Sequence, residues 1–373
     1  LEMCFHSTAV GMELDFSALT EKDLVRILFS EKVGVVVQSP ADLNSAFAAV
    51  GVNAVKIGTT NERSDLSIGA LKLSIPSMRK LWMSTSSKLE AKQTTERLAA
   101  VRADNVVQQP LQFNFPQNFD GKKPEEKTQS LKAAVLREKG SNSEREMAYM
   151  MDLSGFEVRD VHMTDLIEGR ETLEDIQLLV AVGGFSNSDV LGSAKGWAGA
   201  IKYNEKANKA ITNFFNRPDT LSLGVCNGCQ LFVELGLLTP DADELPKMLH
   251  NDSGKFECHF TAVTIQASKS IMLQGLEGST LGIWAAHGEG KFSFPKSESN
   301  YQIPAKYLYS DYPSNPNGSD FNAAMLASED GRHLVMMPHL ERSTFPWNWG
   351  HYPSDRKDDV SPWTMVFENA FNW

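Results

Sequence analysis

The chain has 373 residues, 42% hydrophobic and 22% charged, a composition typical of a globular protein rather than a disordered or membrane protein. Its formal net charge of −11 and sequence pI near 5.3 argue against a nonspecific surface for nucleic acid or anionic lipid, which would need concentrated Lys and Arg. Polar residues interrupt every apolar stretch well short of a membrane span, which favours a cytoplasmic location.

The length predicts two domains, and the first hundred residues alternate strand and helix patterns. Residues 20–23 combine an N-cap with an acidic first turn, ahead of apolar residues over 24–28 that share one helical face. The patterns also predict a strand over 33–38, a helix over 39–51 with Pro40 at its first position, strands over 54–59 and 66–75, and a helical region over 77–104. Residues 1–104 are therefore expected to form a compact α+β domain without a catalytic cluster.

A change of composition separates this domain from the next one. Between 105 and 129 the chain is rich in Gln, Asn, Pro and Lys, and several prolines with Gly121 break any periodicity, so we expect a linker. Farther on, strands predicted over 131–136, 156–161 and 176–182 alternate with a helix over 144–153. Such alternation implies a parallel sheet, with sites at the carboxyl ends of its strands. Residues 130–373 are therefore expected to form an α/β domain.

The strand predicted over 221–225 ends at a cysteine between two glycines. Gly224, Cys226 and Gly228 have the spacing of a nucleophile elbow, a sharp and strained turn that exposes the central side chain. The start of a helix predicted around Leu231 to Leu238 would offer N–H groups and a partial positive charge that stabilise thiolate over thiol. Cys226 is therefore the predicted nucleophile, and the alternative is a buried cysteine that only packs.

The remaining cysteines give no other site. Cys4, Cys226, Cys229 and Cys258 are too few for a disulfide framework in a chain this long. Cys226 and Cys229 form one CxxC, but no second pair completes a zinc site, and no metal site is expected. The two thiols could instead form a redox pair, although the elbow context favours Cys226 as nucleophile and Cys229 as a packing residue.

Two further strand ends carry unusual residues. The strand over 176–182 runs into a glycine pair, 183–184, whose backbone N–H groups could line a small cavity, and a plain tight turn is the alternative. A strand over 334–337 runs into His339 and Glu341, which would point the same way in an extended segment. The carboxylate can then orient the imidazole, although many histidines in such positions are only structural.

Together these strand ends supply the groups that thiol acyl transfer requires. The histidine takes the thiol proton and later protonates the leaving amine, while the carboxylate fixes its tautomer. Backbone N–H groups near Gly184 and Asn227 could hold the oxyanion. Spacing alone does not bring Cys226 and His339 together, so their meeting is an expectation.

The motifs resemble the class I glutamine amidotransferase domain of the phosphoribosylformylglycinamidine synthase family. The resemblance rests on 223–230 (Leu-Gly-Val-Cys-Asn-Gly-Cys-Gln), the Gly-Gly-Phe-Ser loop at 183–186, 338–342, and shorter matches at 136–138, 142–148, 160–166, 189–192 and 286–290. It implies a parallel-sheet, flavodoxin-like domain. Residues 28–38 extend the resemblance to the carboxyl-terminal part of the family's second synthetase-like α+β half.

The resemblance also implies roles for particular residues. It makes Cys226 the nucleophile that forms a glutamyl thioester, His339 the acid and base, and Glu341 the residue that orients His339. The implied oxyanion donors are the backbone groups of Gly184, Phe185 and Asn227. The implied substrate contacts are Gln230, His287, Gly288 and Glu289, and the alternative for the glycines around 288–290 is that they only shape a turn.

By the same resemblance, the chain is the carboxyl-terminal portion of a longer enzyme. That enzyme converts formylglycinamide ribonucleotide, ATP and glutamine to formylglycinamidine ribonucleotide, ADP, phosphate and glutamate. The partners implied are glutamine and the missing N-terminal synthetase domains. No cofactor is expected in this portion, because ATP and Mg²⁺ belong to the missing part and no Gly-rich phosphate loop is present here.

Three positions depart from the family pattern. Asn187 and Ser188 replace a Tyr-Gly pair in the glycine loop, and Leu340 stands where proline is usual. None of these changes removes a reacting group. One alternative hypothesis is a catalytically silent scaffold whose site forms only with the missing synthetase domains. Another is a cysteine hydrolase or redox protein of related topology, against which the segment 338–342 and the resemblance of the N-terminal half argue. The aromatic run 345–352 is expected to serve packing or domain contact.

Overall fold

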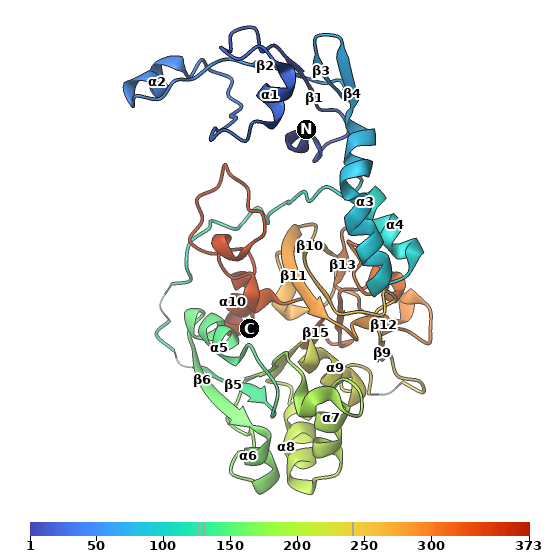
Figure 1. The fold of residues 1–373 in the computed structure, drawn as a ribbon. Helices are drawn as coiled ribbons and strands as arrows, with labels where there is room; N and C mark the ends of the chain where they lie inside the picture. The colour runs from blue at the N-terminus through green and yellow to red at the C-terminus, as the bar shows by residue number, and fades with distance from the viewer. Residues whose placement is uncertain (126, 130, 241) are drawn as a thin grey trace. The chain divides into compact units, whose positions relative to one another are not determined.

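A computed structural model describes residues 1–125, 127–129, 131–240 and 242–373, so position 130, the expected start of the second domain, lies outside the described residues. The chain divides into two compact units. The first holds residues 1–92 and 103–108, and the second holds 93–102 and 109–373 (Figure 1). The domain boundaries expected at 104 and 130 stay a prediction.

The second unit contains a six-stranded sheet with the order β14-β15-β8-β7-β5-β6. Its strands are β5 (Leu131–Arg137), β6 (Phe156–His162), β7 (Leu178–Ala181), β8 (Leu221–Val225), β14 (Met325–Ala327) and β15 (His333–Met336). All neighbours run parallel except the edge strand β14. Strands β7 and β8 are buried throughout, which explains why they read as unbroken apolar runs. The parallel sheet predicted for this part of the chain is confirmed.

Helices cover this sheet. They are α5 (Glu144–Leu153), α6 (Met163–Glu168), α7 (Lys195–Lys202), α8 (Glu205–Asn216), α9 (Asn227–Glu234) and α10 (Thr364–Asn372). Helix α5 packs on β5, β6 and α10, whereas α9 packs on β7, β8 and β15. Large side chains such as Trp197, Phe214, Phe232 and Phe367 fill the core between helices and sheet. Helix α9 begins directly after Cys226, four residues earlier than the apolar pattern from Leu231 predicts.

A smaller antiparallel sheet lies over the carboxyl ends of the parallel strands. It consists of β10 (Glu257–Ile265), β11 (Thr280–His287) and β13 (Ala305–Tyr307), and β9 (Lys247–Leu249) pairs separately with β12 (Lys291–Ser293). The His339 amide donates to the Trp284 carbonyl (2.8 Å), which ties the exit of β15 to β11. This contact brings the end of β11 to the same place as the end of β8.

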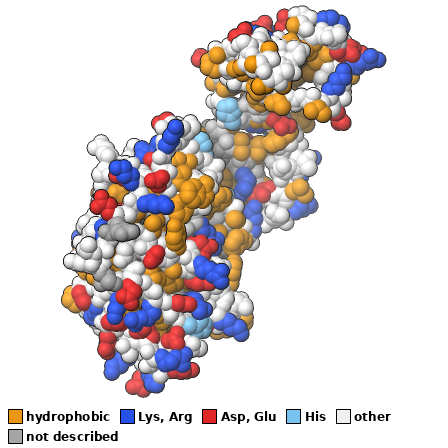
Figure 2. Space-filling view, turned by 90° about the vertical axis from the view of Figure 1, so that its left-hand side faces the viewer, with side chains coloured by type: hydrophobic (Ala, Val, Ile, Leu, Met, Phe, Trp, Pro, Cys, Tyr) orange, Lys and Arg blue, Asp and Glu red, His pale blue; other side chains and the backbone are white. Residues whose placement is uncertain are grey.

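The first unit has a four-stranded sheet and little core. Its elements are β1 (Gly11–Leu14), β2 (Gly58–Asn61), β3 (Asp65–Ile68), β4 (Leu71–Ser74), α1 (Leu24–Phe29), α2 (Asn44–Ala49) and α3 (Ile75–Gln93), and α4 (Glu96–Asn105) lies across the division between the units. The sheet order is β2-β1-β3-β4. The buried apolar residues are Cys4, Phe5, Leu66 and Ile75, and hydrophobic side chains are visible on the surface of this unit (Figure 2).

Short 3₁₀ turns complete the chain: η1 (Glu2–Cys4), η2 (Ser186–Asp189), η3 (Ile271–Leu273), η4 (Glu298–Asn300), η5 (Asp320–Asn322), η6 (Leu340–Arg342) and η7 (Pro346–Asn348). Of these, η2 and η6 belong to the candidate site. None of the helices within the described ranges is both long and apolar enough to cross a bilayer.

Several predictions for the first unit are wrong. The strand predicted over 33–38 is absent, and Val33, Val35, Val36 and Val37 are exposed, because no described strand pairs with them. The helix predicted over 39–51 is shortened to α2, since the Ser39 hydroxyl and the Asp42 carboxylate accept hydrogen bonds from nearby amides and form turns instead.

Three other segments differ from their predicted form. The strand predicted over 54–59 is shifted to β2, and the single strand over 66–75 is the hairpin β3–β4, which turns at Gly69 with a φ of +57°. The helical region 77–104 breaks near Thr95, whose hydroxyl accepts a hydrogen bond from the Leu98 amide and caps α4.

The segment expected to be a linker is docked on the second unit in part. Asn114 and Thr280 exchange backbone hydrogen bonds of 3.0 and 2.8 Å, and Phe113 and Phe115 contact the Trp349 ring. The prolines therefore mark irregular backbone here rather than a free tether.

Candidate active site

Cys226 occupies the turn between β8 and α9 in a strained conformation, with φ of +52° and ψ of −105°. Its amide donates to the Met336 carbonyl at 2.8 Å, which fixes the turn against β15. Both neighbouring glycines are needed for close approach. A Cβ on Gly228 would lie 2.0 Å from the Ala181 oxygen, and one on Gly224 would lie 2.6 Å from the Gly228 oxygen. The strained turn is the one that the glycine spacing predicts.

His339 and Glu341 form a buried pair. The distance from His339 Nδ1 to Glu341 Oε1 is 2.6 Å, and the residues are 1% and 3% exposed. The extended segment predicted for them is wrong, because the chain enters the 3₁₀ turn η6 directly after His339. The contact forms nonetheless, since the turn brings the carboxylate back beneath the ring.

The pair and the thiol are electrostatically linked. Burial alone would lower the pKa of His339, but the charges of Glu341 and of a Cys226 thiolate outweigh burial and raise that pKa to about 10. Burial would likewise raise the pKa of Glu341, and the imidazolium lowers it below its ordinary value. His339 Nε2, the ring nitrogen not bonded to Glu341, makes no hydrogen bond of good geometry to a described atom. Glu341 therefore stabilises the imidazolium that forms when His339 accepts a proton.

Gly183 explains how the thiol and the imidazole approach each other. A Cβ at this position would lie 2.9 Å from His339 Cε1 and 3.4 Å from Cys226 Cβ. Both side chains therefore rest against the bare backbone at the end of β7. The structure thus brings Cys226, His339 and Glu341 together, as the three strand ends led us to expect.

The glycine loop after β7 carries the candidate oxyanion donors. Gly184 has a φ of +119°, and a Cβ there would lie 2.6 Å from Ser141 Cα. The Phe185 amide donates to the Gly140 carbonyl at 2.9 Å, so this predicted donor is already engaged in this loop arrangement. The amides of Gly184 and Asn227 are left as candidates. The Asn227 carboxamide accepts from the Ser186 amide (3.1 Å) and ties the loop to α9.

The departure from the family pattern in this loop has a structural consequence. Asn187 and Ser188 adopt left-handed backbone, with φ of +53° and +58°. We expect Ser188→Gly, which restores the glycine typical of the family, to raise the free energy of unfolding by roughly 0.5–1 kcal/mol, because left-handed backbone is unfavourable for a residue with a Cβ. Urea unfolding followed by tryptophan fluorescence measures this.

A matched control is Ser297→Gly, at an exposed serine with a φ of −63°. This change should not stabilise the chain, because glycine adds conformational freedom there and removes the hydroxyl that accepts from the Asn300 carboxamide (2.8 Å). Equal effects of the two substitutions would contradict the strain at Ser188.

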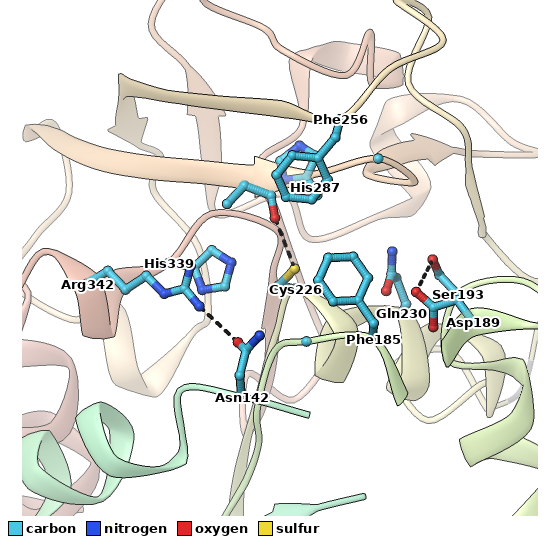
Figure 3. A pocket seen from close by; sticks show the side chains of 13 residues that line it. Asn142, Phe185, Asp189, Ser193, Cys226, Gln230, Phe256, His287, His339 and Arg342 are labelled. Atoms are coloured by element: carbon cyan, nitrogen blue, oxygen red, sulfur yellow. Dashed lines mark hydrogen bonds between the residues drawn. The ribbon is translucent and has the colours of Figure 1, made fainter. Parts of the chain in front are cut away.

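Cys226 and His339 border a cleft that opens to solvent, and Glu341 lies buried behind His339 (Figure 3). The lining residues of the cleft are Asn142, Gly184, Phe185, Asp189, Ser193, Cys226, Gln230, Phe256, Ala286, His287, Gly288, His339 and Arg342. Three of the four predicted substrate contacts, Gln230, His287 and Gly288, are among them. Glu289 is not a lining residue, and its carboxylate accepts from the Ser193 amide at 3.3 Å.

The predicted substrate-binding residues differ in their hydrogen bonds and in their burial. Gln230 donates to the Glu289 carbonyl (2.7 Å) and accepts from the Asn227 carboxamide (2.9 Å). His287 is 2% exposed, and its Nε2 lies 3.1 Å from the Asn317 amide nitrogen. Burial and, secondarily, the charge of His339 lower the pKa of His287 to about 3, so His287 is neutral at pH 7. Their contacts with a substrate stay a prediction.

Sequence reasoning gave no role to several lining residues. Arg342 Nη2 donates to Asn142 Oδ1 (2.9 Å) and Ser143 Oγ (2.7 Å), which ties the turn after Glu341 to the start of α5. Arg342 belongs to the segment 338–342, which carries His339 and Glu341, so its charge next to Glu341 could have indicated a role at the site. No sequence pattern around Phe256 indicates a role at the site, because Phe256 reaches the cleft only through the position of the antiparallel sheet.

Cys229, the second cysteine of the CxxC sequence, is packed in the core. Cys229 is fully buried, and burial raises the pKa of its thiol well above the ordinary value. All four cysteines are free thiols. In the described part of the chain, no group of three or more His, Cys, Asp or Glu side chains is arranged to hold a metal ion.

Comparisons with known proteins agree with this geometry. A family model described as a CobB/CobQ-like glutamine amidotransferase domain matches residues 130–373. Probable phosphoribosylformylglycinamidine synthase, chloroplastic/mitochondrial, of Arabidopsis thaliana is 39% identical over 412 residues, covering all of this chain and 29% of that protein. Phosphoribosylformylglycinamidine synthase of Homo sapiens is 37% identical over 417 residues, covering all of this chain and 31% of that protein.

A solved structure of PurLQS from Thermotoga maritima aligns with a TM-score of 0.53 and 26% identity, over 67% of this chain and 98% of that one. The fold is that of class I glutamine amidotransferases. The chain spans less than a third of the length of the two curated relatives named above. It belongs to the CobB/CobQ-like glutamine amidotransferase family, and its whole length is homologous to part of the phosphoribosylformylglycinamidine synthases.

Proposed function

We propose that the second unit hydrolyses glutamine through a glutamyl thioester on Cys226. The observation that carries this proposal is the elbow thiol beside the buried His339–Glu341 pair. His339 takes the thiol proton, and the thiolate attacks the carboxamide carbon of glutamine. The amides of Gly184 and Asn227 are the candidate donors to the resulting oxyanion.

The reaction then balances with water as the second substrate. When the tetrahedral intermediate collapses, the carbon–nitrogen bond breaks and His339 donates its proton to the leaving ammonia. Water, deprotonated by His339, attacks the thioester, releases glutamate and returns the thiol. Glu341 stays ionised throughout and stabilises the imidazolium.

The charges along the cleft support free glutamine as the substrate. Asp189, Ser193 and Gln230 lie on the far side of Cys226 from Arg342 (Figure 3). The Asp189 carboxylate accepts from the Ser193 hydroxyl and the Ala194 amide, both at 3.3 Å, and has no Lys or Arg ion-pair partner among the described residues. Glu289 adds a second negative charge nearby. An α-ammonium group suits this end when the carboxamide is at Cys226.

We further propose that the ammonia serves ATP-dependent amidation of formylglycinamide ribonucleotide in de novo purine biosynthesis, in the cytoplasm. The names of the two curated relatives and the fraction of their length covered here support this. The partner would be the synthetase part of a longer enzyme, which would bind ATP and Mg²⁺. The described residues offer no carboxylate cluster suited to Mg²⁺.

Glutamate release from glutamine tests the proposal. The chain of 373 residues is expected to release glutamate, measured by a coupled glutamate dehydrogenase assay. If release occurs only in a protein of the length of its relatives, the silent-scaffold hypothesis describes this chain better. If neither protein releases glutamate, the proposed function is wrong.

A further inference from the structure

Two phenylalanines face each other at the mouth of the cleft. Phe185 comes from the glycine loop and Phe256 from the residue before β10, and their ring centroids are 6.0 Å apart. Both line the cleft, although they are 49% and 47% exposed. Figure 3 shows the Phe185 ring beside Cys226 and the Phe256 ring above it, in front of His287.

The backbone at both positions is fixed, whereas the rings are not packed in the core. The Phe185 amide is held by the Gly140 carbonyl, and the next residue is tied to Asn227. Phe256 precedes Glu257, which is 2% exposed and bonds to Arg102 Nη2 and the Tyr312 hydroxyl, each at 3.0 Å. Neither ring belongs to the hydrophobic core cluster of the second unit. Each ring can therefore turn about its side-chain bonds without moving its loop.

An apolar pair is unexpected at the entrance to a site for a zwitterion. Glutamine has charged groups at one end, a carboxamide at the other and two methylene groups between them. With the carboxamide at Cys226 and the ammonium group toward Asp189, the methylene groups would pass beside the Phe185 and Phe256 rings. The rings match the one apolar part of the substrate.

We propose that Phe185 and Phe256 form an aromatic cover over Cys226, which contacts the methylene groups of glutamine and limits access to the thiol. The contact with glutamine rests on the proposed glutaminase function. The limited access of reagents to the thiol does not depend on that function. The cover selects a slim, unbranched side chain and displaces water from the cleft while the thioester forms.

The test is alkylation of Cys226, read by peptide mass spectrometry, in the whole chain. The reagents are iodoacetamide, which is small, and a bulky N-aryl maleimide. Phe185→Ala, Phe256→Ala and the double variant should accelerate the maleimide about tenfold, which corresponds to about 1.4 kcal/mol of activation free energy, and iodoacetamide less than about twofold. Exposed Cys258 in the same digest reports reagent activity.

Glutamine kinetics provide the second readout. Each alanine variant should raise KM for glutamine roughly tenfold with little change in kcat, because contact with two methylene groups is lost. The matched control is Tyr203→Ala, which removes a 91% exposed ring that does not line the cleft. Phe256→Leu, which keeps an apolar side chain, should restore most of the affinity. Unchanged urea midpoints exclude unfolding as the cause.

The results of these two experiments distinguish a failure of the aromatic cover from a failure of the proposed glutaminase function. Maleimide rates in the phenylalanine variants equal to those in Tyr203→Ala would overturn the cover, even if the chain hydrolyses glutamine. Accelerated maleimide reaction in a chain that never releases glutamate would support control of access and refute the glutaminase proposal alone.

Discussion

Replacing Cys226 by alanine is expected to lower kcat for glutamine hydrolysis by on the order of 10⁴-fold or more, because no other group can form the acyl intermediate. Removal of a triad nucleophile leaves only the rate enhancement from binding and oxyanion contacts. The direct measurement is mass spectrometry after treatment with a diazo-ketone norleucine, a glutamine-like electrophile. The unmodified sequence should carry one adduct on the peptide containing Cys226, and the variant none.

Cys258→Ala is the matched control, because Cys258 is exposed and lies outside the cleft. This variant should keep both the adduct and the hydrolytic rate. An adduct that survives in Cys226→Ala, or that disappears in Cys258→Ala, would assign the reactive thiol elsewhere.

Glu341→Gln is expected to lower kcat by roughly 10⁴-fold while leaving the fold intact, because an amide can hold the imidazole in the wrong tautomer and cannot stabilise the imidazolium. It should also lower the pKa of His339, since burial would then act against a weaker opposing charge. NMR titration of the imidazole measures that pKa, and glutamate release measures the rate.

The same variant should change how stability depends on pH. The pKa of His339 is raised from 6.5 to about 10, so its contribution to stability is complete below pH 6.5 and is lost as pH rises through about 10. The pKa of Glu341 is lowered from 4.5, so its contribution is present above pH 4.5 and is lost at lower pH. The pair should stabilise the unmodified fold most between these limits.

Urea unfolding across roughly pH 3 to 11 should therefore show both slopes weakened in Glu341→Gln. Glu277→Gln serves as the control, since Glu277 is an exposed glutamate that does not line the cleft. It should keep the rate and the pH dependence. A Glu341→Gln rate within about tenfold of the unmodified chain would mean that the carboxylate does not support the histidine in this way.

The sequence predicts most accurately the parts whose partners are local or wholly buried. Helix α5 has the predicted bounds, and β8 reads correctly because a strand buried on both faces is apolar at every position. The meeting of Cys226 with His339 follows from the pairing of β8 with β15, in register from Ser222 and His333 onward. The spacing of strands along the sequence does not show which strands are neighbours in a parallel sheet.

The errors share a different cause. Whether Val33–Val37 forms a strand depends on a partner strand, and whether the Phe185 amide is free depends on a hydrogen bond to Gly140. Phe256 reaches the cleft only through the arrangement of β10. In each case the deciding interaction joins residues that no local pattern relates.

The exposed valines of the first unit have a consequence for the behaviour of the chain in solution. Residues 33–38 (Val-Gly-Val-Val-Val-Gln) form an uncharged, valine-rich run without proline, and Val33 and Val35 are almost fully accessible. Segments of this kind offer unsatisfied backbone groups and apolar side chains to any similar segment that they meet. At high concentration, copies of this chain are therefore expected to associate through this run.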